Sequence, residues 1–251
     1  MPSFKTLGAA SARNLGYSIS GRAQGSTPTI SASFTAQATT TSVATVANVT
    51  CPAYGVLLVC SGAEVTTLAS IGISSISYGG LTFTKRTAQT FAGHLGTSNQ
   101  TLEIWYAINN SASAISGASA LSIFYNNTFD DQAVVVASVS GCYMTAPWST
   151  VGPYVNYQLN STATQATNTY STSLPNSLAI EFHGTNDPNA LGYVTTSGWS
   201  GVNSIQNPGA TYWEYVFLSS RGFTSQQTNL TTTTSGTASA SWISIVDSLV
   251  S

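Results

Sequence analysis

Residues 132–140, with the sequence QAVVVASVS, place three consecutive valines, Val134, Val135 and Val136, between small and polar residues. Successive side chains of a β-strand point to opposite faces, so this run presents valine on both faces. β-Branched residues also favour strands over helices. We therefore expect a strand buried on both faces, by a core on one side and by an arm, a loop or a neighbouring subunit on the other.

The segment TLEIWYAI, residues 101–108, has the alternation of a strand with two different faces. Leu102, Ile104 and Tyr106 point one way, whereas Glu103 and Trp105 point the other. Similar short runs recur along the chain, separated by turn residues such as Gly-Gly, Asn-Asn and Ser-Gly. The other runs are residues 29–36, 42–49, 54–62, 74–78, 81–90, 118–125, 176–184, 211–220, 227–236 and 238–250.

These short runs, with no sustained 3.6-residue periodicity, predict an all-β protein with an antiparallel, jelly-roll-like β-sandwich. We expect residues 26–251 to form the sandwich, either as one unit or as two halves that meet near residues 145–175. Residues 1–25 are predicted to form an extended N-terminal arm, since the stretch GRAQGSTP, residues 21–28, has the composition of a linker.

Charged residues are scarce. The 251 residues include eight acidic and six basic side chains, against 38 serines, 36 threonines and 21 glycines. Soluble domains are ordinarily about a quarter charged, so few residues are present from which to build catalytic or metal sites. A net charge of −2 does not favour nucleic acid, and no apolar run approaches the length of a membrane span. We expect a structural or binding protein without catalytic residues, cofactor or bound metal.

Half of the basic residues lie in the predicted arm. Lys5, Arg13 and Arg22 are therefore candidate interaction residues, with the arm contacting a neighbouring subunit or docking on its own domain. The first residues contain no continuous apolar segment of the kind found in secretory signals, so we expect no such signal.

Several segments, taken in order, resemble a β-sandwich module of tailed-bacteriophage virion proteins and of secreted bacterial surface proteins. The resemblance covers residues 29–250 and implies a sandwich fold; it carries no catalytic signature to transfer. The matching segments are GVLLVCSG (55–62), ISSISYGGLTFTKRTA (73–88), LEIWYAIN (102–109), AVVVASVSG (133–141), TAPW (145–148), PNSLAIEFHG (175–184), TSGWS (196–200) and SASWISIVDSLV (239–250).

Two histidines, His94 and His183, are present. A serine hydrolase of the α/β type would carry its nucleophile in a G-x-S-x-G turn, which this sequence does not contain. His183 lies on a predicted strand two residues from Glu181, and we interpret it as a structural residue.

The segment NNTFDDQ contains the candidate cation ligands Asn126, Asn127, Asp130 and Asp131. Carboxylate and amide oxygens are ligands for Ca²⁺. Asn and Asp are also common in turns, where they bond to the local backbone, and we favour a turn here.

The three cysteines are an odd number. Cys51 and Cys60 flank one predicted strand, so an extended chain would hold them too far apart for a disulfide. Cys142 could pair with either, but we expect free, buried thiols. The absence of a C-x-x-C sequence argues against zinc and redox sites.

Trp148 and Trp199 lie in loop-like contexts, TAPWST and TSGWSG. An indole in a loop can stack on a sugar or anchor a subunit, or it can pack locally. Both are named as candidate interaction residues. Trp105, Trp213 and Trp242 lie on predicted strands and are expected in the core.

These observations predict a virion structural protein, located in the virion as a capsid decoration (cement) or tail-associated subunit. Its partners would be copies of itself or another virion subunit, and neither nucleic acid nor a membrane. One alternative is a carbohydrate-binding or host-adhesion module, which would bind a glycan through an exposed Trp148 or Trp199. Another is the subunit of an extracellular filament joined by donor-strand exchange.

Overall fold

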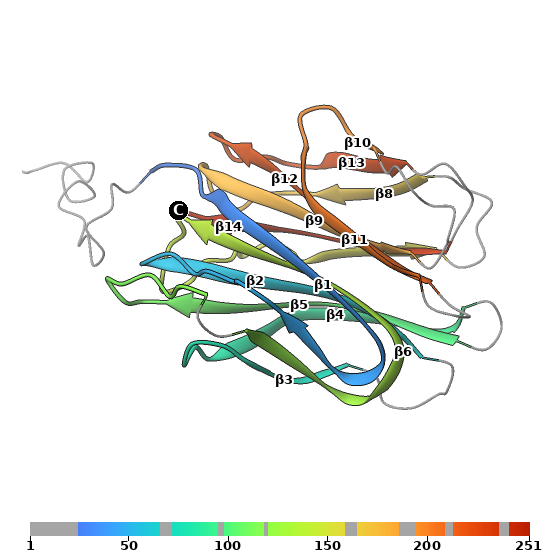
Figure 1. Ribbon diagram of the computed structural model, residues 1–251. Coiled ribbons are helices and arrows are strands. Elements are labelled where there is room, and N and C mark those ends of the chain that lie inside the picture. Colours follow the sequence, from blue (N-terminus) through green and yellow to red (C-terminus); the bar gives the residue numbers. More distant parts are fainter. Residues whose placement is uncertain are drawn as a thin grey trace, which may run out of the picture.

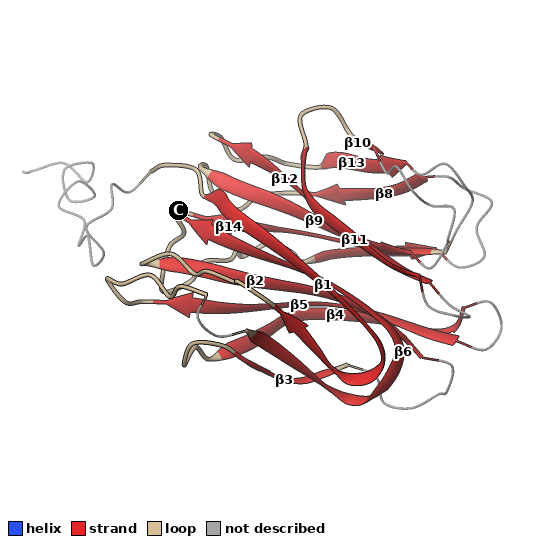
Figure 2. Cartoon of the chain, in the orientation of Figure 1, coloured by secondary structure: helices blue, strands red, loops and turns tan. Residues whose placement is uncertain are grey.

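The computed structural model stacks antiparallel β-sheets in layers (Figure 1). The structure describes residues 25–65, 72–94, 98–117, 120–158, 165–185, 194–208, 213–235 and 241–251. Within these ranges it contains strands, turns and loops but no helix (Figure 2). The predicted arm, residues 1–25, lies outside this part of the chain except for Gly25.

The first sheet, sheet I, is built from the first half of the chain. Its strands lie in the order β1-β6-β2-β5-β4, and β3 pairs with β6 off this path. Their bounds are β1 Thr29–Val46, β2 Gly55–Val65, β3 Ile73–Ser77, β4 Phe83–His94, β5 Ser98–Asn109 and β6 Leu121–Ser140.

The second half of the chain forms two further sheets. Sheet II has the order β11-β12-β9-β14-β7, and sheet III has the order β10-β13-β8. Their strands are β7 Tyr154–Gln158, β8 Gln165–Tyr170, β9 Ser177–Thr185, β10 Val194–Thr195, β11 Ser200–Pro208, β12 Trp213–Phe223, β13 Leu230–Ser235 and β14 Trp242–Val250. Sheet II lies between sheet I and sheet III (Figure 1).

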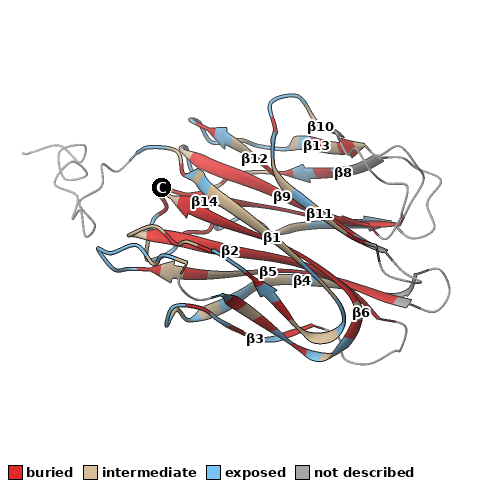
Figure 3. Ribbon diagram, in the orientation of Figure 1, coloured by how far each residue is buried: buried red, intermediate tan, exposed pale blue. Residues whose placement is uncertain are grey.

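The main core lies between sheets I and II and follows from strict alternation along their strands. On β5, Leu102 and Ile104 point into this core, as the sequence predicts, while Trp105 packs on the opposite face. Strands β2, β9 and β14 are buried along their whole length (Figure 3). The other core residues include Val56, Leu58, Val135, Val139, Ile180, Phe182, Val216, Leu218, Ile243 and Ile245.

Strands β1 and β6, of 18 and 20 residues, are long enough to belong to two layers. Their register shifts between Thr41 and Val43 of β1. After this shift, the end of β1 pairs with the start of β6, and the start of β6 also pairs with β3. We call residues 43–46, 73–77 and 121–125 the outer layer. It forms a second core over the far face of sheet I, with Val134 and Val136 among its contacts.

This outer layer explains the three valines. The expected burial of both faces is confirmed, but the second face is covered by the chain's own β1, β3 and β6. The sequence analysis offered only an arm, a loop or a neighbouring subunit for that role.

The antiparallel all-β sandwich is confirmed. Sheet I comes from residues before 141, and sheets II and III come from residues after 153, so each sheet uses one half of the chain. A jelly roll instead passes its strands between the two sheets, and the strand order does not support that narrower description. The predicted runs 29–36 and 42–49 are one strand, and β7, β8 and β11 were not predicted.

The three cysteines are free and buried, as expected. Burial raises the pKa of the Cys51 thiol to about 11 and also raises that of Cys60. Since the thiolate is the reactive form, burial keeps these two thiols unreactive near neutral pH.

Packing between sheets I and II can be tested at Gly184 on β9. A methyl group there would overlap the side chain of Leu102 on β5. We expect Gly184→Ala to lower the free energy of unfolding by about 1–3 kcal/mol, as overpacking typically does. Leu102→Ala alone should cost about 2–5 kcal/mol. Urea denaturation should show the double variant to be more stable than the sum of the two losses, whereas simple additivity would contradict this contact.

Candidate functional site

An irregularity in β4 separates two adjacent cations. Lys85 is in register with Trp105 of β5, and Thr87 is in register with Ile104, so Arg86 is an extra residue between them. Successive side chains of a strand point to opposite faces, so Lys85 contacts the outer face of sheet I and Arg86 reaches into the sandwich. The extra residue then places Thr87 opposite Ile104.

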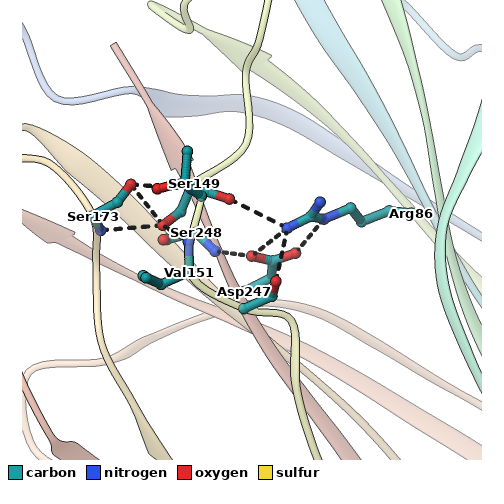
Figure 4. Close-up of polar contacts among 8 residues, drawn as sticks. Arg86, Ser149, Val151, Ser173, Asp247 and Ser248 are labelled. Carbon is teal, nitrogen blue, oxygen red and sulfur yellow. Dashed lines mark hydrogen bonds and ion pairs between the residues drawn. The ribbon is translucent and has the colours of Figure 1, made fainter.

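Arg86 forms an ion pair that joins sheet I to sheet II. Its Nε atom donates to Oδ2 of Asp247 on β14 at 2.6 Å, and its Nη2 atom donates to Oδ1 at 3.3 Å (Figure 4). The guanidinium also lies 5.0 Å from the ring centre of Trp148, a cation–π distance. The Asp247 side chain is fully buried, whereas that of Arg86 is 21% exposed.

The environment of Asp247 sets its protonation. Burial raises the pKa of Asp247, and the opposing effects of Arg86 and of the Ser248 backbone N–H partly offset this. The Ser248 N–H donates to Oδ1 at 2.8 Å. Arg86 therefore favours the charged form of the buried carboxyl group, and the pair acts as a link between layers.

The link continues into the chain that leads to β7. Arg86 Nη2 donates to the carbonyl oxygens of Ser149 and Gly152 at 3.4 Å. Ser149 Oγ donates to Ser173 Oγ at 2.8 Å and accepts from the backbone N–H of Val151 at 3.2 Å (Figure 4). These contacts fix residues 149–153 where they leave the edge of β14.

Lys85 forms a similar group on the opposite face. Its Nζ atom lies 3.0 Å from Oε2 of Glu103 and 5.1 Å from the ring centre of Trp105. Glu103 also accepts from Trp105 Nε1 at 2.6 Å and from the Ile73 N–H at 2.9 Å. This second ion pair ties the start of β3 to sheet I, but Lys85 is 41% exposed.

A polar layer lies between sheets II and III around Glu181 of β9. Thr232 and Ser244 donate to its two carboxyl oxygens at 3.0 Å, and Asn168 donates to Ser244 at 2.7 Å. Burial raises the pKa of Glu181, and the hydroxyl donors partly offset this. The carboxyl group is therefore held by hydroxyl donors, one of which is in turn held by the Asn168 amide.

His183 follows on the same face of β9 and is buried, as we expect of a structural residue. Its ring stacks on Trp242 with 6.1 Å between centroids, and burial lowers its pKa to about 3. The imidazole is thus neutral at physiological pH. His94 ends β4, and its side chain lies outside the described part of the structure.

The interpretation of residues 126–131 as a turn is wrong, because they lie within β6. Alternation along a strand places Asp130 and Asp131 on opposite faces, so they do not form one cage of ligands. Asp131 is buried and stands in register with Glu64 of β2 and Thr39 of β1. Burial and, to a smaller extent, the charge of Asp130 raise the pKa of Asp131 to about 6.

The described residues contain no group of three or more His, Cys, Asp or Glu side chains placed to hold a metal ion.

Both candidate tryptophans are packed inside the chain. Trp148 and Trp199 are each 8% exposed. Trp148 meets Tyr106 edge-on at 5.5 Å, and Trp199 meets Tyr170 in the same way at 5.8 Å. Of the two roles considered, the structure shows local packing, and the exposed indole required for glycan stacking is not seen. The three other candidates, Lys5, Arg13 and Arg22, lie outside the described residues.

Sequence reasoning did not single out Arg86, Asp247 or Glu103. One signal was present: Lys85 and Arg86 are adjacent in a strand, where alternation would place two cations on opposite faces. Asp247 lies within the apolar run WISIVDSLV, where a carboxylate needs a partner.

Comparisons with protein-family models, curated proteins and solved structures found no match to this chain. No helix in the described ranges is long and apolar enough to cross a membrane.

The two ion pairs provide a matched test. Arg86→Met leaves Asp247 buried without its cation and should lower the free energy of unfolding by about 3–5 kcal/mol at neutral pH. Lys85→Met removes a more exposed partner, and Glu103 retains its Ile73 and Trp105 donors, so the loss should be at most about 1 kcal/mol.

Urea denaturation of both variants checks this difference. Adding Asp247→Asn to Arg86→Met should recover part of the stability, because it removes the unpaired charge. Equal losses for Arg86→Met and Lys85→Met would contradict the assignment of the inner pair as the stronger link.

The raised pKa of Asp131 predicts that the stability of the protein depends on pH. In the folded protein this pKa is about 6, against 3.8 for the ordinary side chain, so Asp131 keeps its proton to a higher pH when folded. The free energy of unfolding should therefore fall as pH rises through this window. Asp131→Asn should remove that component, so its stability relative to the unsubstituted protein should rise by about 1–3 kcal/mol between pH 4 and 6. If the free energies of unfolding of the variant and of the unsubstituted protein change equally between pH 4 and 6, the assignment of Asp131 as a buried, protonated side chain is contradicted.

Proposed function

We propose that this protein is a structural subunit of a virion, either a capsid decoration (cement) protein or a tail-associated protein. It would act by packing against copies of itself or another virion subunit. The assignment to a virion rests on the sequence resemblance, and the mode of action rests on where the structure places its charges.

The observation that carries this proposal is that the described part of the chain buries five of its acidic side chains. The buried acidic side chains are Glu64, Glu103, Asp131, Glu181 and Asp247. Lys85 and Arg86 pair with two of them, and Arg221 lies 4.9 Å from the ring centre of Phe223. The exposed surface of the described chain is consequently left mainly to hydroxyl, amide and small apolar groups.

A surface of this kind suits contact between subunits. Burying an ion costs far more free energy than burying a hydroxyl or amide that finds a hydrogen-bond partner. Interface centres are depleted in charged residues and enriched in aromatic ones. The large exposed apolar residues of the described chain are Phe124, Tyr143, Val151, Val155, Tyr157 and Leu174.

The arm, residues 1–25, is proposed to contact a neighbouring subunit through its sequence and through Lys5, Arg13 and Arg22. An extended segment can pair with an exposed sheet edge, which adds affinity and protects that edge from unwanted association. The described structure offers such edges because sheets I and II are open rather than closed into a barrel.

One alternative receives less support. A carbohydrate-binding module was expected to expose Trp148 or Trp199, and both are buried. A filament subunit joined by donor-strand exchange would use the same kind of arm and is the second candidate.

Self-association is the first test of the proposed function. Light scattering should give a mass above the 26.0 kDa of one chain. Because the surface of the described chain carries little charge, the assembled mass should persist from about 0.1 to 1 M salt. Over this range the screening length falls from ~10 to ~3 Å, which should weaken only the contribution of Lys5, Arg13 and Arg22. A 26.0 kDa species at every concentration would contradict self-assembly. Dissociation in high salt would contradict contact through uncharged surface.

A further inference from the structure

Strand β7 leaves one edge of sheet II open. It is the last strand in the order and pairs with β14 on one side only. Val155 and Tyr157 lie on the same face of β7 and are 36% and 52% exposed. The Tyr157 N–H donates to the side chain of Asn156 at 2.8 Å, and that side chain donates to the Thr167 carbonyl oxygen of β8 at 2.6 Å.

Exposed apolar residues gather around this edge. Val151, in the chain leading to β7, is 36% exposed, and Leu174 is 48% exposed. Leu174 follows Ser173, whose Oγ accepts from the Thr150 N–H at 3.1 Å. Four of the large exposed apolar residues of the described chain therefore lie on or beside β7.

The opposite edge of the sandwich is closed by its own side chains. There, Asn207 of β11 donates to Thr39 Oγ1 and to the Gln132 carbonyl at 3.2 Å. Asn203 of β11 donates to Ser33 of β1 at 3.1 Å. On the β7 side, the described contacts from sheet I are made by Arg86, with Asp247, Gly152 and the Trp148 ring, and by Tyr106, with Trp148. The β11 edge is thus covered by hydrogen bonds between sheet I and β11 itself, whereas among the described residues the strand edge of β7 is not covered in this way.

The arm joins the described chain at one end of the sandwich, and β7 runs from near that end toward the other. A side chain at Gly25 would contact Asn176, which immediately precedes β9. Strand β14 pairs there with the start of β9, through Val250 and Ser177. Strand β7 runs from Tyr154 toward the other end of β14, where Gln158 pairs with Trp242. A segment leading back from Gly25 along β7 would therefore be antiparallel to it.

The sequence of the arm has a segment suited to this edge. Residues 14–20, NLGYSIS, lie outside the described residues and alternate Leu15, Tyr17 and Ile19 with glycine and serine. Alternation with period two gives a strand one apolar face and one small, polar face. Residues 21–24 connect this segment to the described chain.

We propose that residues 14–20 of one copy add to the β7 edge of a neighbouring copy as an antiparallel strand. Leu15, Tyr17 and Ile19 would lie on the face that carries Val155 and Tyr157, and the small residues would lie on the face toward sheet III. This inference rests on the proposed function and identifies the contact through which the copies assemble.

The short connector favours exchange between copies over closure within one chain. Only four residues, 21–24, separate the segment from Gly25. Short hinges strain the closed form of a protein and promote exchange of an element between copies. The contact joins two different surfaces, so repeated use would produce a ring or a filament.

Complementation between two full-length variants tests the contact. Tyr157→Lys places a charge on the receiving edge, at an exposed position where lysine opposes strand addition. Tyr17→Asp combined with Ile19→Asp disables the arm and leaves β7 intact. Each variant alone should be a 26.0 kDa monomer in light scattering, and a 1:1 mixture should form a dimer of twice that mass. Thr231→Lys, at an exposed position on β13, is the control and should assemble like the unsubstituted protein.

The possible failures are distinguishable. If the unsubstituted protein assembles and both variants do so equally well, the copies meet at another surface and this inference is wrong, while the proposed function stands. If each variant is a monomer and the mixture forms no dimer, exchange between copies is also overturned. If the unsubstituted protein is itself a monomer, self-assembly and this inference fail together.

Discussion

The ion pair between Arg86 and Asp247 crosses the interior of the sandwich, from β4 of sheet I to β14 of sheet II. Removing two ions from water costs several kcal/mol each, so the pair must be held in good geometry to persist. A two-point contact, the Trp148 ring and the backbone carbonyls of residues 149 and 152 supply that geometry. Alternation along β4 turns Arg86 inward while Lys85 stays outside, and the bulge sets the register of β4 beyond them.

The same principle extends to the other charges. Glu103 holds β3 to sheet I through Lys85 and the Ile73 backbone, and Glu181 lies in the polar layer that joins sheets II and III. The charged residues thus stabilise contacts between the layers of one chain. The exterior is left with groups that lose little on desolvation, which is the property that a subunit packed against other subunits requires.

Most strands could be predicted from the sequence because alternation and valine-rich runs are local signals. The bends of β1 and β6 could not, since NNTFDD is typical of a turn, and β1 pairs with it only near its end, where Thr41 lies opposite Phe129. Strands β7, β8 and β11 are rich in polar residues and lack a run of apolar ones, so their place in sheets depends on their neighbours.

The candidate site was predicted less well than the fold, for a related reason. The position of Arg86 depends on its register against β5, which no local pattern encodes. Trp148 and Trp199 look like loop residues in sequence, yet Tyr106 and Tyr170, distant along the chain, cover them. The inward placement of carboxylates likewise follows from tertiary packing. Composition indicated that charges are few but not where they lie.

The central claim is that the buried carboxyl groups stabilise contacts between the layers of the protein. Carboxyl-carbon NMR titration of the folded chain tests it most directly. The account predicts that Asp131, Glu181 and Asp247 titrate above the ordinary range of their side chains, with Asp131 near pH 6. Titration of all three at the values of free, water-exposed side chains would contradict it, because it would mean that water reaches the groups assigned to the spaces between the sheets.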